Sequence, residues 1–147
     1  MVALTRAQRE AMGFDREAFL NQPPPGGPEE GYVIPTSMYL LHCQGFYKVG
    51  IAANVRSRLS TIQTSNPHKV TLERVNNYPC RAYAVMAERL AHQLLAPHRR
   101  SGEWFGGLDR RQIGAVLSEA QSAMKMLIDR HRWAEIKALR ERGEWVL

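Results

Sequence analysis

Residues 38–51 read MYLLHCQGFYKVGI and decide the fold of this chain. Two short apolar runs, 38–43 and 46–51, flank the dipeptide Gln44-Gly45. Side chains alternate in each run, and a glycine at the turn can take a positive φ, so the stretch predicts a β-hairpin with a two-residue turn. The remaining elements can be placed outward from this hairpin.

The register of the hairpin decides which side chains share a face. If Cys43 lies opposite Phe46, Tyr39 and Lys48 are diagonal neighbours on one face. A three-residue loop would instead put Tyr47 beside Tyr39, so the choice between Lys48 and Tyr47 stays open here. An ammonium group beside the phenol is expected to lower the pKa of Tyr39 from its ordinary value of about 10, which would suit a general base toward water.

Helices and one more strand follow the hairpin. Asn54 predicts the N-cap of a helix that stops before Pro67, and residues 70–76 are a third strand candidate. Residues 81–96 predict a helix, and Asp109 predicts the cap of a long C-terminal helix. The sequence therefore predicts an α+β fold, with a small three-stranded antiparallel sheet flanked by helices and a long C-terminal helix.

The amino-terminal segment differs in composition from the rest of the chain. Thr5 and Asp15 predict the caps of two short helices, and residues 22–31, QPPPGGPEEG, predict a linker. We expect this segment to lie outside the core. The predicted division is an N-terminal helical appendage with its linker at 1–31, a main domain at 32–108, and a C-terminal helical extension packed on it at 109–147.

Positive charge is concentrated in the middle of the chain. Residues 36–108 carry a net charge of +6, equal to the excess of the whole chain. A local excess of cations favours a nucleic-acid partner, because neutralising phosphates releases counterions. Arginine outnumbers lysine sixteen to four, which suits bidentate phosphate contacts.

Cysteine usage and hydropathy limit the class of protein. Cys43 and Cys80 are far apart and match no zinc-ligand spacing, which is typical of a reducing compartment. No stretch approaches the roughly 18 apolar residues that a membrane span needs, and the start has no run of signal-peptide length. We therefore expect a soluble, cytoplasmic protein without a membrane partner.

The hairpin and the two following helices carry a set of chemically active residues. Gly50 ends the second strand and leaves room for a phosphate, and Arg58 lies one turn into the next helix, where it can donate to a phosphate oxygen. Glu88 lies in an apolar stretch, so we expect a cation beside it, either Arg58 or a hard metal ion. His92, four residues after Glu88, lies on the same helix face as Glu88. Together with Tyr39 these groups predict a site that cleaves phosphodiesters.

These motifs give the chain a resemblance to a known family. Ser-Met-Tyr at 37–39 stands where that family has Gly-Ile-Tyr, and Lys-Val-Gly at 48–50 stands where it has Tyr-Ile-Gly. Arg58, Glu88 and the closing Gly-Glu-Trp-Phe at 102–105 follow in the family's order. From Met38 to Phe105 the chain thus resembles a GIY-YIG nuclease domain, in particular the phage and bacterial branch with Tyr-Lys-Ile-Gly and Gly-Glu-Trp-Phe motifs. It departs from the family at Ser37, at Lys48 and near Glu103.

The resemblance implies a metal-dependent DNA endonuclease. Glu88 would bind Mg²⁺ or Mn²⁺, Tyr39 would act as general base, and Arg58 would stabilise the transition state. The supporting catalytic candidates are Lys48, Tyr47 and His92. The expected contacts to the DNA backbone are Arg56, Arg99 and Arg100.

Two other functions remain open from the sequence. The same fold could serve as a catalytically silent nucleic-acid-binding or adaptor module. The chain could also be a protein-interaction domain that forms a homodimer through the apolar stripe from Ile113 to Ile128, which would then be exposed.

Overall fold

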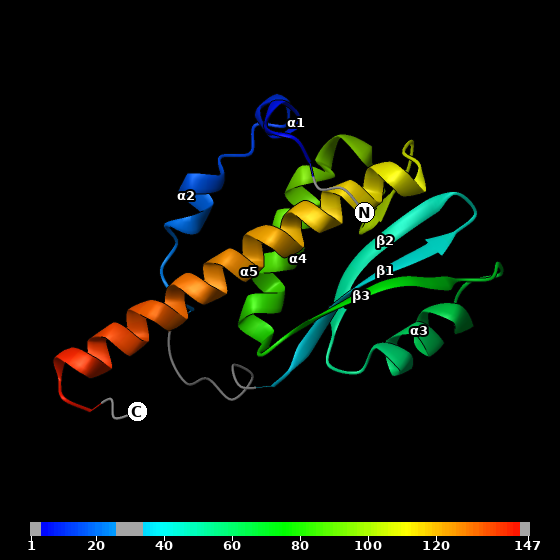
Figure 1. The fold of residues 1–147 in the computed structure, drawn as a ribbon. Coiled ribbons are helices and arrows are strands. Elements are labelled where there is room, and N and C mark those ends of the chain that lie inside the picture. The colour runs from blue at the N-terminus through cyan, green and yellow to red at the C-terminus, as the bar shows by residue number, and fades with distance from the viewer. Residues whose placement is uncertain (1–3, 26–33, 145–147) are drawn as a thin grey trace.

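The computed structural model of this protein describes residues 4–25 and 34–144. The helices are α1 Arg6–Ala11, α2 Arg16–Leu20, α3 Val55–Thr64, α4 Arg81–Leu94 and α5 Arg110–Glu141, with a 3₁₀ turn at Ala96–His98. The strands are β1 Thr36–Cys43, β2 Phe46–Ala52, β3 Thr71–Tyr78, β4 Arg99–Ser101 and β5 Trp104–Phe105. In Figure 1, α3 lies on one side of the sheet and α4 and α5 lie on the other.

The predicted hairpin is confirmed in its register. Cys43 lies opposite Phe46, and Tyr39 lies opposite Gly50. The two turn residues both take positive φ, 53° at Gln44 and 80° at Gly45. Two positive φ values give a turn whose twist matches that of the flanking strands, so a two-residue loop is the natural connection here.

The sheet has five antiparallel strands in the order β3-β1-β2-β5-β4, so the predicted three-stranded sheet is wrong. The α+β class and the long C-terminal helix are present. The additional strands β4 and β5 form a small hairpin around Gly102, whose φ is +56°. β5 pairs with Tyr47 and Lys48 of β2. Strands of two and three residues are too short to show an alternating pattern, which is why the sequence predicts only three strands.

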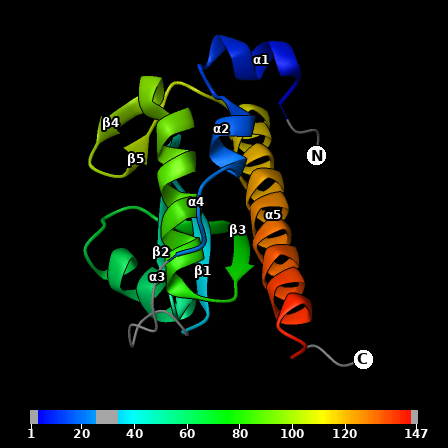
Figure 2. The same ribbon diagram turned by 90° about the vertical axis from the view of Figure 1, so that its left-hand side faces the viewer.

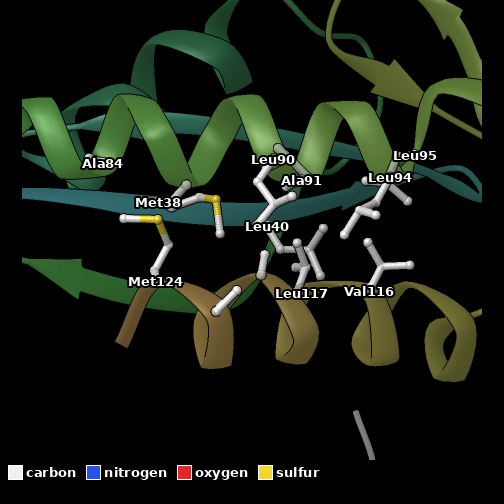
Figure 3. Close-up of a cluster of buried hydrophobic side chains, with 14 of the residues drawn as sticks. Met38, Leu40, Ala84, Leu90, Ala91, Leu94, Leu95, Val116, Leu117 and Met124 are labelled. Carbon is white, nitrogen blue, oxygen red and sulfur yellow. The ribbon is translucent and has the colours of Figure 1, made fainter. Parts of the chain in front are cut away.

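The larger core fills the space between the sheet and helices α4 and α5. Figure 3 shows Met38 and Leu40 of β1 in this layer, together with Leu90 and Leu94 of α4 and Leu117 of α5. Burying each leucine side chain stabilises the fold by about 2 kcal/mol. This layer fixes α4, and therefore the residues α4 carries, against the centre of the sheet.

A smaller core lies on the opposite face of the sheet. Tyr39 and Leu41 alternate with the residues of the larger core and point to this second face. Val55, Leu59 and Ile62 of α3 pack against them, as the i, i+4, i+7 spacing predicts. Helix α3 is thereby held over the strand that carries Tyr39.

The N-terminal segment contributes to the larger core through Phe14, which lies between α1 and α2, and Leu20 of α2, so the expectation that the whole segment lies outside the core is wrong. Phe14 and Leu20 are 7% and 1% exposed and belong to the larger core. Figure 2 shows α2 lying against α5. The predicted caps Thr5 and Asp15 are confirmed, since each side chain accepts a hydrogen bond from the backbone three residues later.

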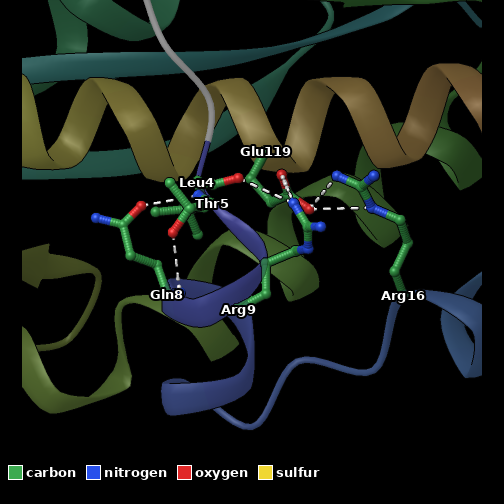
Figure 4. A network of polar contacts seen from close by, with 6 residues as sticks. All are labelled: Leu4, Thr5, Gln8, Arg9, Arg16 and Glu119. Atoms are coloured by element: carbon green, nitrogen blue, oxygen red, sulfur yellow. Dashed lines mark hydrogen bonds and ion pairs between the residues drawn. The ribbon is translucent and has the colours of Figure 1, made fainter.

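A buried glutamate on α5 holds these N-terminal helices in place. Glu119 Oε1 accepts hydrogen bonds from Arg16 Nη2 at 2.6 Å and Arg16 Nε at 3.2 Å, and Oε2 lies 3.6 Å from Arg9 Nη1 (Figure 4). Arg9 Nη1 also donates to the Leu4 carbonyl at 2.9 Å. The Glu119 side chain is fully buried, so its charge depends on these two arginines.

Three further sequence predictions concern segments beyond this core. Residues 26–31 of the predicted linker lie outside the described residues. None of the helices in the described ranges is long and apolar enough to cross a membrane. The α5 stripe is buried in the larger core, with Ile113, Met124 and Leu127 at 0% exposure and Ile128 packed against the core. The stripe is therefore not the exposed apolar surface that the protein-interaction alternative requires.

Candidate active site

Tyr39 occupies the centre of the site because its β-strand partner is a glycine. A Cβ at Gly50 would lie 2.6 Å from Tyr39 Cζ and still closer to the hydroxyl oxygen. The phenol therefore lies directly over Gly50, in the space that a side chain at position 50 would fill. Tyr39 is only 3% exposed.

Gly50→Ala tests this close approach. The new methyl group would force the phenol aside, and overpacking of this kind costs about 2 kcal/mol. We expect urea denaturation to show that loss of stability when Gly50→Ala is made in the otherwise wild-type protein. The same substitution in a Tyr39→Ala background should cost little, because the clash is gone. An equal loss in both backgrounds would contradict the proposed contact.

The register settles the choice between Lys48 and Tyr47. Lys48 pairs with Leu41 and so shares the face of Tyr39, whereas Tyr47 is 5% exposed in the core on the opposite face, with its ring 4.9 Å from that of His42. Tyr47 is thus not brought into the site. Its hydroxyl cannot assist Tyr39 from there.

Lys48 is engaged by a carboxylate that the sequence analysis did not place in the site. Lys48 Nζ donates to Glu103 Oε2 at 2.6 Å, and the ammonium lies 5.9 Å from the centre of the Trp104 ring. Lys48 pairs with Trp104 across the β2–β5 register, which brings Glu103, the residue before Trp104, alongside. The Lys48 ammonium is therefore paired with the carboxylate of Glu103, which lies in the turn between β4 and β5.

The expected lowering of the Tyr39 pKa is wrong. Burial raises the pKa of Tyr39 to about 12; the Arg58 guanidinium opposes this rise, and the carboxylates of Glu103 and Glu88 add to it. Lys48 is not among the groups that shift the pKa of Tyr39, and its ammonium is paired with Glu103. The phenol is therefore protonated at neutral pH, and Arg58 is the cation that favours its ionised form.

The two arginines of α3 differ in their relation to the phenol. Asn54 caps α3, as predicted, by accepting from the Ser57 backbone at 3.0 Å. Arg58 and Arg56 are both exposed, but only Arg58 acts electrostatically on Tyr39. The structure thus brings Arg58 into the site and leaves Arg56 on the outer surface of the helix.

Glu88 approaches the same phenol from α4. Burial raises the pKa of Glu88, and the nearby Glu103 carboxylate raises it further, while His92, Lys48 and Arg81 lower it. Among the described residues, Glu88 makes no hydrogen bond or salt bridge. A half-buried carboxylate next to a second carboxylate and without a paired cation has the charge environment of a cation site.

This donor set fits a hard divalent ion that keeps most of its waters. Within residues 4–25 and 34–144, no group of three or more His, Cys, Asp or Glu side chains gathers around one point. Mg²⁺ is commonly held by one or two carboxylates together with substrate phosphates. Glu88, with Glu103 nearby, is therefore sufficient for Mg²⁺ or Mn²⁺ in the presence of a phosphate, and too sparse for Zn²⁺.

His92 has a structural contact in this site. Its Nε2–H donates to the Val49 carbonyl at 2.8 Å, and its ring lies 5.2 Å from that of Phe105. β5 pairs with β2 only at Tyr47 and Lys48, so His92 satisfies the next carbonyl along this edge. The histidine thus fixes α4 and Glu88 against β2.

The remaining predicted contacts lie on the β4–β5 hairpin. Arg99 and Arg100 are both exposed. The Arg99 guanidinium lies 5.7 Å from the centre of the Phe105 ring, and Arg100 Nη1 donates to the Arg99 carbonyl at 3.3 Å. These cations lie beside the site without entering it.

Glu103 is the site residue that sequence reasoning missed as a functional group. Its carboxylate pairs with Lys48 and acts on both Tyr39 and Glu88. The local signals were the Gly-Glu-Trp-Phe motif and the turn at Gly102, whose positive φ places Glu103 directly before β5. The departure at Ser37 has a local explanation, because its hydroxyl donates to Asn77 Oδ1 at 2.6 Å and ties β1 to β3.

Comparison with known proteins corrects the expected family. The family model that matches the chain is that of the T5orf172 domain, over residues 31–121, which is more than half of the chain. The predicted membership of the GIY-YIG nucleases is therefore wrong. No curated protein and no solved structure matches the chain significantly. The matched interval contains every residue of the site described above.

Proposed function

Because the chain belongs to the T5orf172 domain family, a nuclease-like and DNA-binding family, we propose that it is a metal-dependent DNA endonuclease. The observation that carries this proposal is the convergence of three groups. Arg58 from α3 and Glu88 from α4 both act on the hydroxyl of Tyr39 from β1. A guanidinium, a carboxylate and a phenol in one place can orient and hydrolyse a phosphodiester.

Each side chain has a distinct part in the proposed reaction. Glu88 would hold Mg²⁺ or Mn²⁺, which when bound would supply Lewis-acid stabilisation of the scissile phosphate. Tyr39 must first lose its phenolic proton to solvent, an ionisation that Arg58 favours; the phenolate would then take a proton from the attacking water, and Arg58 would donate to the phosphate oxygen. Lys48 keeps the Glu103 carboxylate paired, and His92 fixes α4.

Backbone contacts would come from cations around this centre. Arg56 on α3 and Arg99 and Arg100 on β4 are exposed on elements that flank the site. Contacts of this kind position a strand without reading its sequence. The +6 net charge of residues 36–108 supports a DNA partner for the same surface.

The direct test is cleavage of plasmid and single-stranded DNA by purified protein. We propose that products appear with Mg²⁺ or Mn²⁺ and are absent with EDTA. Failure of the folded protein to cut either form of DNA with any divalent ion would contradict the endonuclease proposal.

Arg58→Ala separates chemistry from binding. Loss of a donor to the transition state is expected to lower the cleavage rate at saturating DNA roughly a hundredfold. Arg56→Ala is the matched control two residues earlier on α3. Arg56→Ala should leave the cleavage rate at saturating DNA unchanged. It should lower only the slope of log affinity against log salt concentration, by about one. Equal effects of both variants on the cleavage rate would show that Arg58 does not stabilise the transition state.

DNA binding without cleavage is the second candidate function. Two observations favour it, namely the Tyr39 pKa of about 12 and the pairing of Lys48 with Glu103. Under this alternative, Arg58→Ala and Glu88→Gln would leave DNA affinity and activity in cells unchanged. The same pair of variants therefore distinguishes the two functions.

A further inference from the structure

A groove of about 470 Å³ lies beside the candidate active site and contains none of Tyr39, Arg58 or Glu88. It is bordered by the β1–β2 turn, the loop that follows α3, and the β4–β5 hairpin. Its volume lies in the range of small-ligand pockets. Its lining includes the side chains of Phe46, Trp104, Arg100, His68, Gln44 and Asn66.

Two aromatic rings give the groove apolar faces. Phe46 is 44% exposed, which is unusual for a ring of this size. Its position depends on Gly106, because a Cβ there would lie 2.9 Å from two atoms of the Phe46 ring. Trp104 lines the same groove and is partly buried against the smaller core, so its indole is held in place. Held aromatic rings of this kind are platforms on which nucleobases stack.

The polar lining favours an anionic and hydrogen-bonding occupant. Arg100 supplies a positive charge, and among the described residues no acidic side chain lines the groove. Asn66 is fixed in place, since its Oδ1 accepts from the His68 backbone N–H at 3.0 Å and from Cys43 Sγ at 3.7 Å. Gln44 adds a second amide at the turn. Amides and a guanidinium around two rings match the edge and the phosphate of a nucleotide.

The groove is continuous with the candidate active site through Trp104. Trp104 pairs with Lys48, whose ammonium binds the Glu103 carboxylate, and Glu103 acts on Tyr39. A strand with one base on Trp104 is thus next to the phosphate position over Tyr39. Since the faces of a base inside a duplex are covered by stacking on its neighbours, the occupant must be an unstacked, unpaired base.

We propose that this groove binds an unpaired DNA base and that the substrate is single-stranded or locally open DNA. The inference rests on the proposed function, because it names the form of DNA on which the same site acts.

Trp104 itself can report this binding. In a Trp133→Phe, Trp145→Phe background, Trp104 is the only tryptophan in the chain. Titration with a short oligothymidylate in EDTA should quench its emission to a saturable limit, because a stacked base lies on the indole. A blunt duplex of the same length should leave the emission unchanged. Absence of quenching by the single strand would overturn the proposal.

Phe46→Leu removes one ring and keeps an apolar side chain. It should weaken binding of the single strand about tenfold and leave duplex affinity unchanged. Phe46→Tyr keeps the ring and should bind as wild type does. Leu72→Ala, at an exposed apolar residue of β3 away from the groove, is the matched control and should have no effect. An equal loss of affinity for both forms of DNA in Phe46→Leu would overturn the proposal.

Measurement in EDTA keeps this test separate from the test of cleavage. Quenching by single strands without cutting in Mg²⁺ would support the groove and contradict the endonuclease. Cutting of duplex DNA without quenching would contradict the groove and leave the endonuclease standing.

Discussion

Glu88→Gln is expected to abolish detectable DNA cleavage, with a fall in rate of roughly a thousandfold. The amide has the shape of the carboxylate but no charge with which to hold a divalent ion. Glu88 has no hydrogen-bond or salt-bridge partner among the described residues, so its replacement should not disturb the fold. The measurement is single-turnover cleavage at several Mg²⁺ concentrations.

Glu141→Gln is the matched control for this experiment. It makes the same chemical change at an exposed position near the end of α5 and should cleave as wild type does. Thermal unfolding of both variants should coincide with that of wild type. Cleavage by Glu88→Gln at more than a tenth of the normal rate would show that Glu88 does not hold the metal ion.

The largest expected effect on stability comes from Glu119→Ala. Removal of the carboxylate leaves Arg16 and Arg9, which are 27% and 20% exposed, without their charge partner. Loss of one member of a buried ion pair costs about 3 kcal/mol in free energy of unfolding. Urea denaturation followed by circular dichroism measures this loss.

The same variant should loosen α1 and α2 locally. Trypsin cleaves after arginine, so faster cleavage at Arg9 and Arg16 under native conditions should accompany the lower stability. Arg9→Ala is the graded control, because its 3.6 Å contact is longer than the 2.6 Å contact of Arg16 and should matter less. A change below about 0.5 kcal/mol in Glu119→Ala, the range of ordinary surface substitutions, would contradict the role of this cluster.

Local features of the fold could be predicted from the sequence because their causes are local. The caps at Thr5, Asp15, Asn54 and Asp109 depend on side chains three residues from their partners, and all four are present. The hairpin register followed from the two-residue turn at Gly45. Placement of Tyr39 and Lys48 on one face needed no information beyond this register.

Features that depend on distant residues could not be predicted. The Lys48–Glu103 pair joins positions 55 residues apart, and it changes the electrostatics around Tyr39. The Glu119–Arg16 pair spans 103 residues, so the acidic residue appeared in the sequence as an ordinary helix position. In both cases burial and pairing come from tertiary packing, which a spacing pattern does not contain.

The two corrections to the expected architecture have the same origin. β4 and β5 are stabilised by pairing with the edge of β2 and have little pattern of their own. Helices α1 and α2 have only six and five residues, and Leu20 of α2 is buried in a core that α5 helps to form. Short elements of this kind take their structure from what they pack against.

The burial of Phe14 and Leu20 bears on how the matched family interval should be used in the laboratory. Both side chains precede residue 31, and Met124 and Leu127 of the same core follow residue 121. A recombinant fragment trimmed to 31–121 would lack these core side chains at both ends and expose the apolar surfaces that they cover. The hydrophobic core therefore extends beyond the matched interval at both ends, and expression boundaries should follow the core.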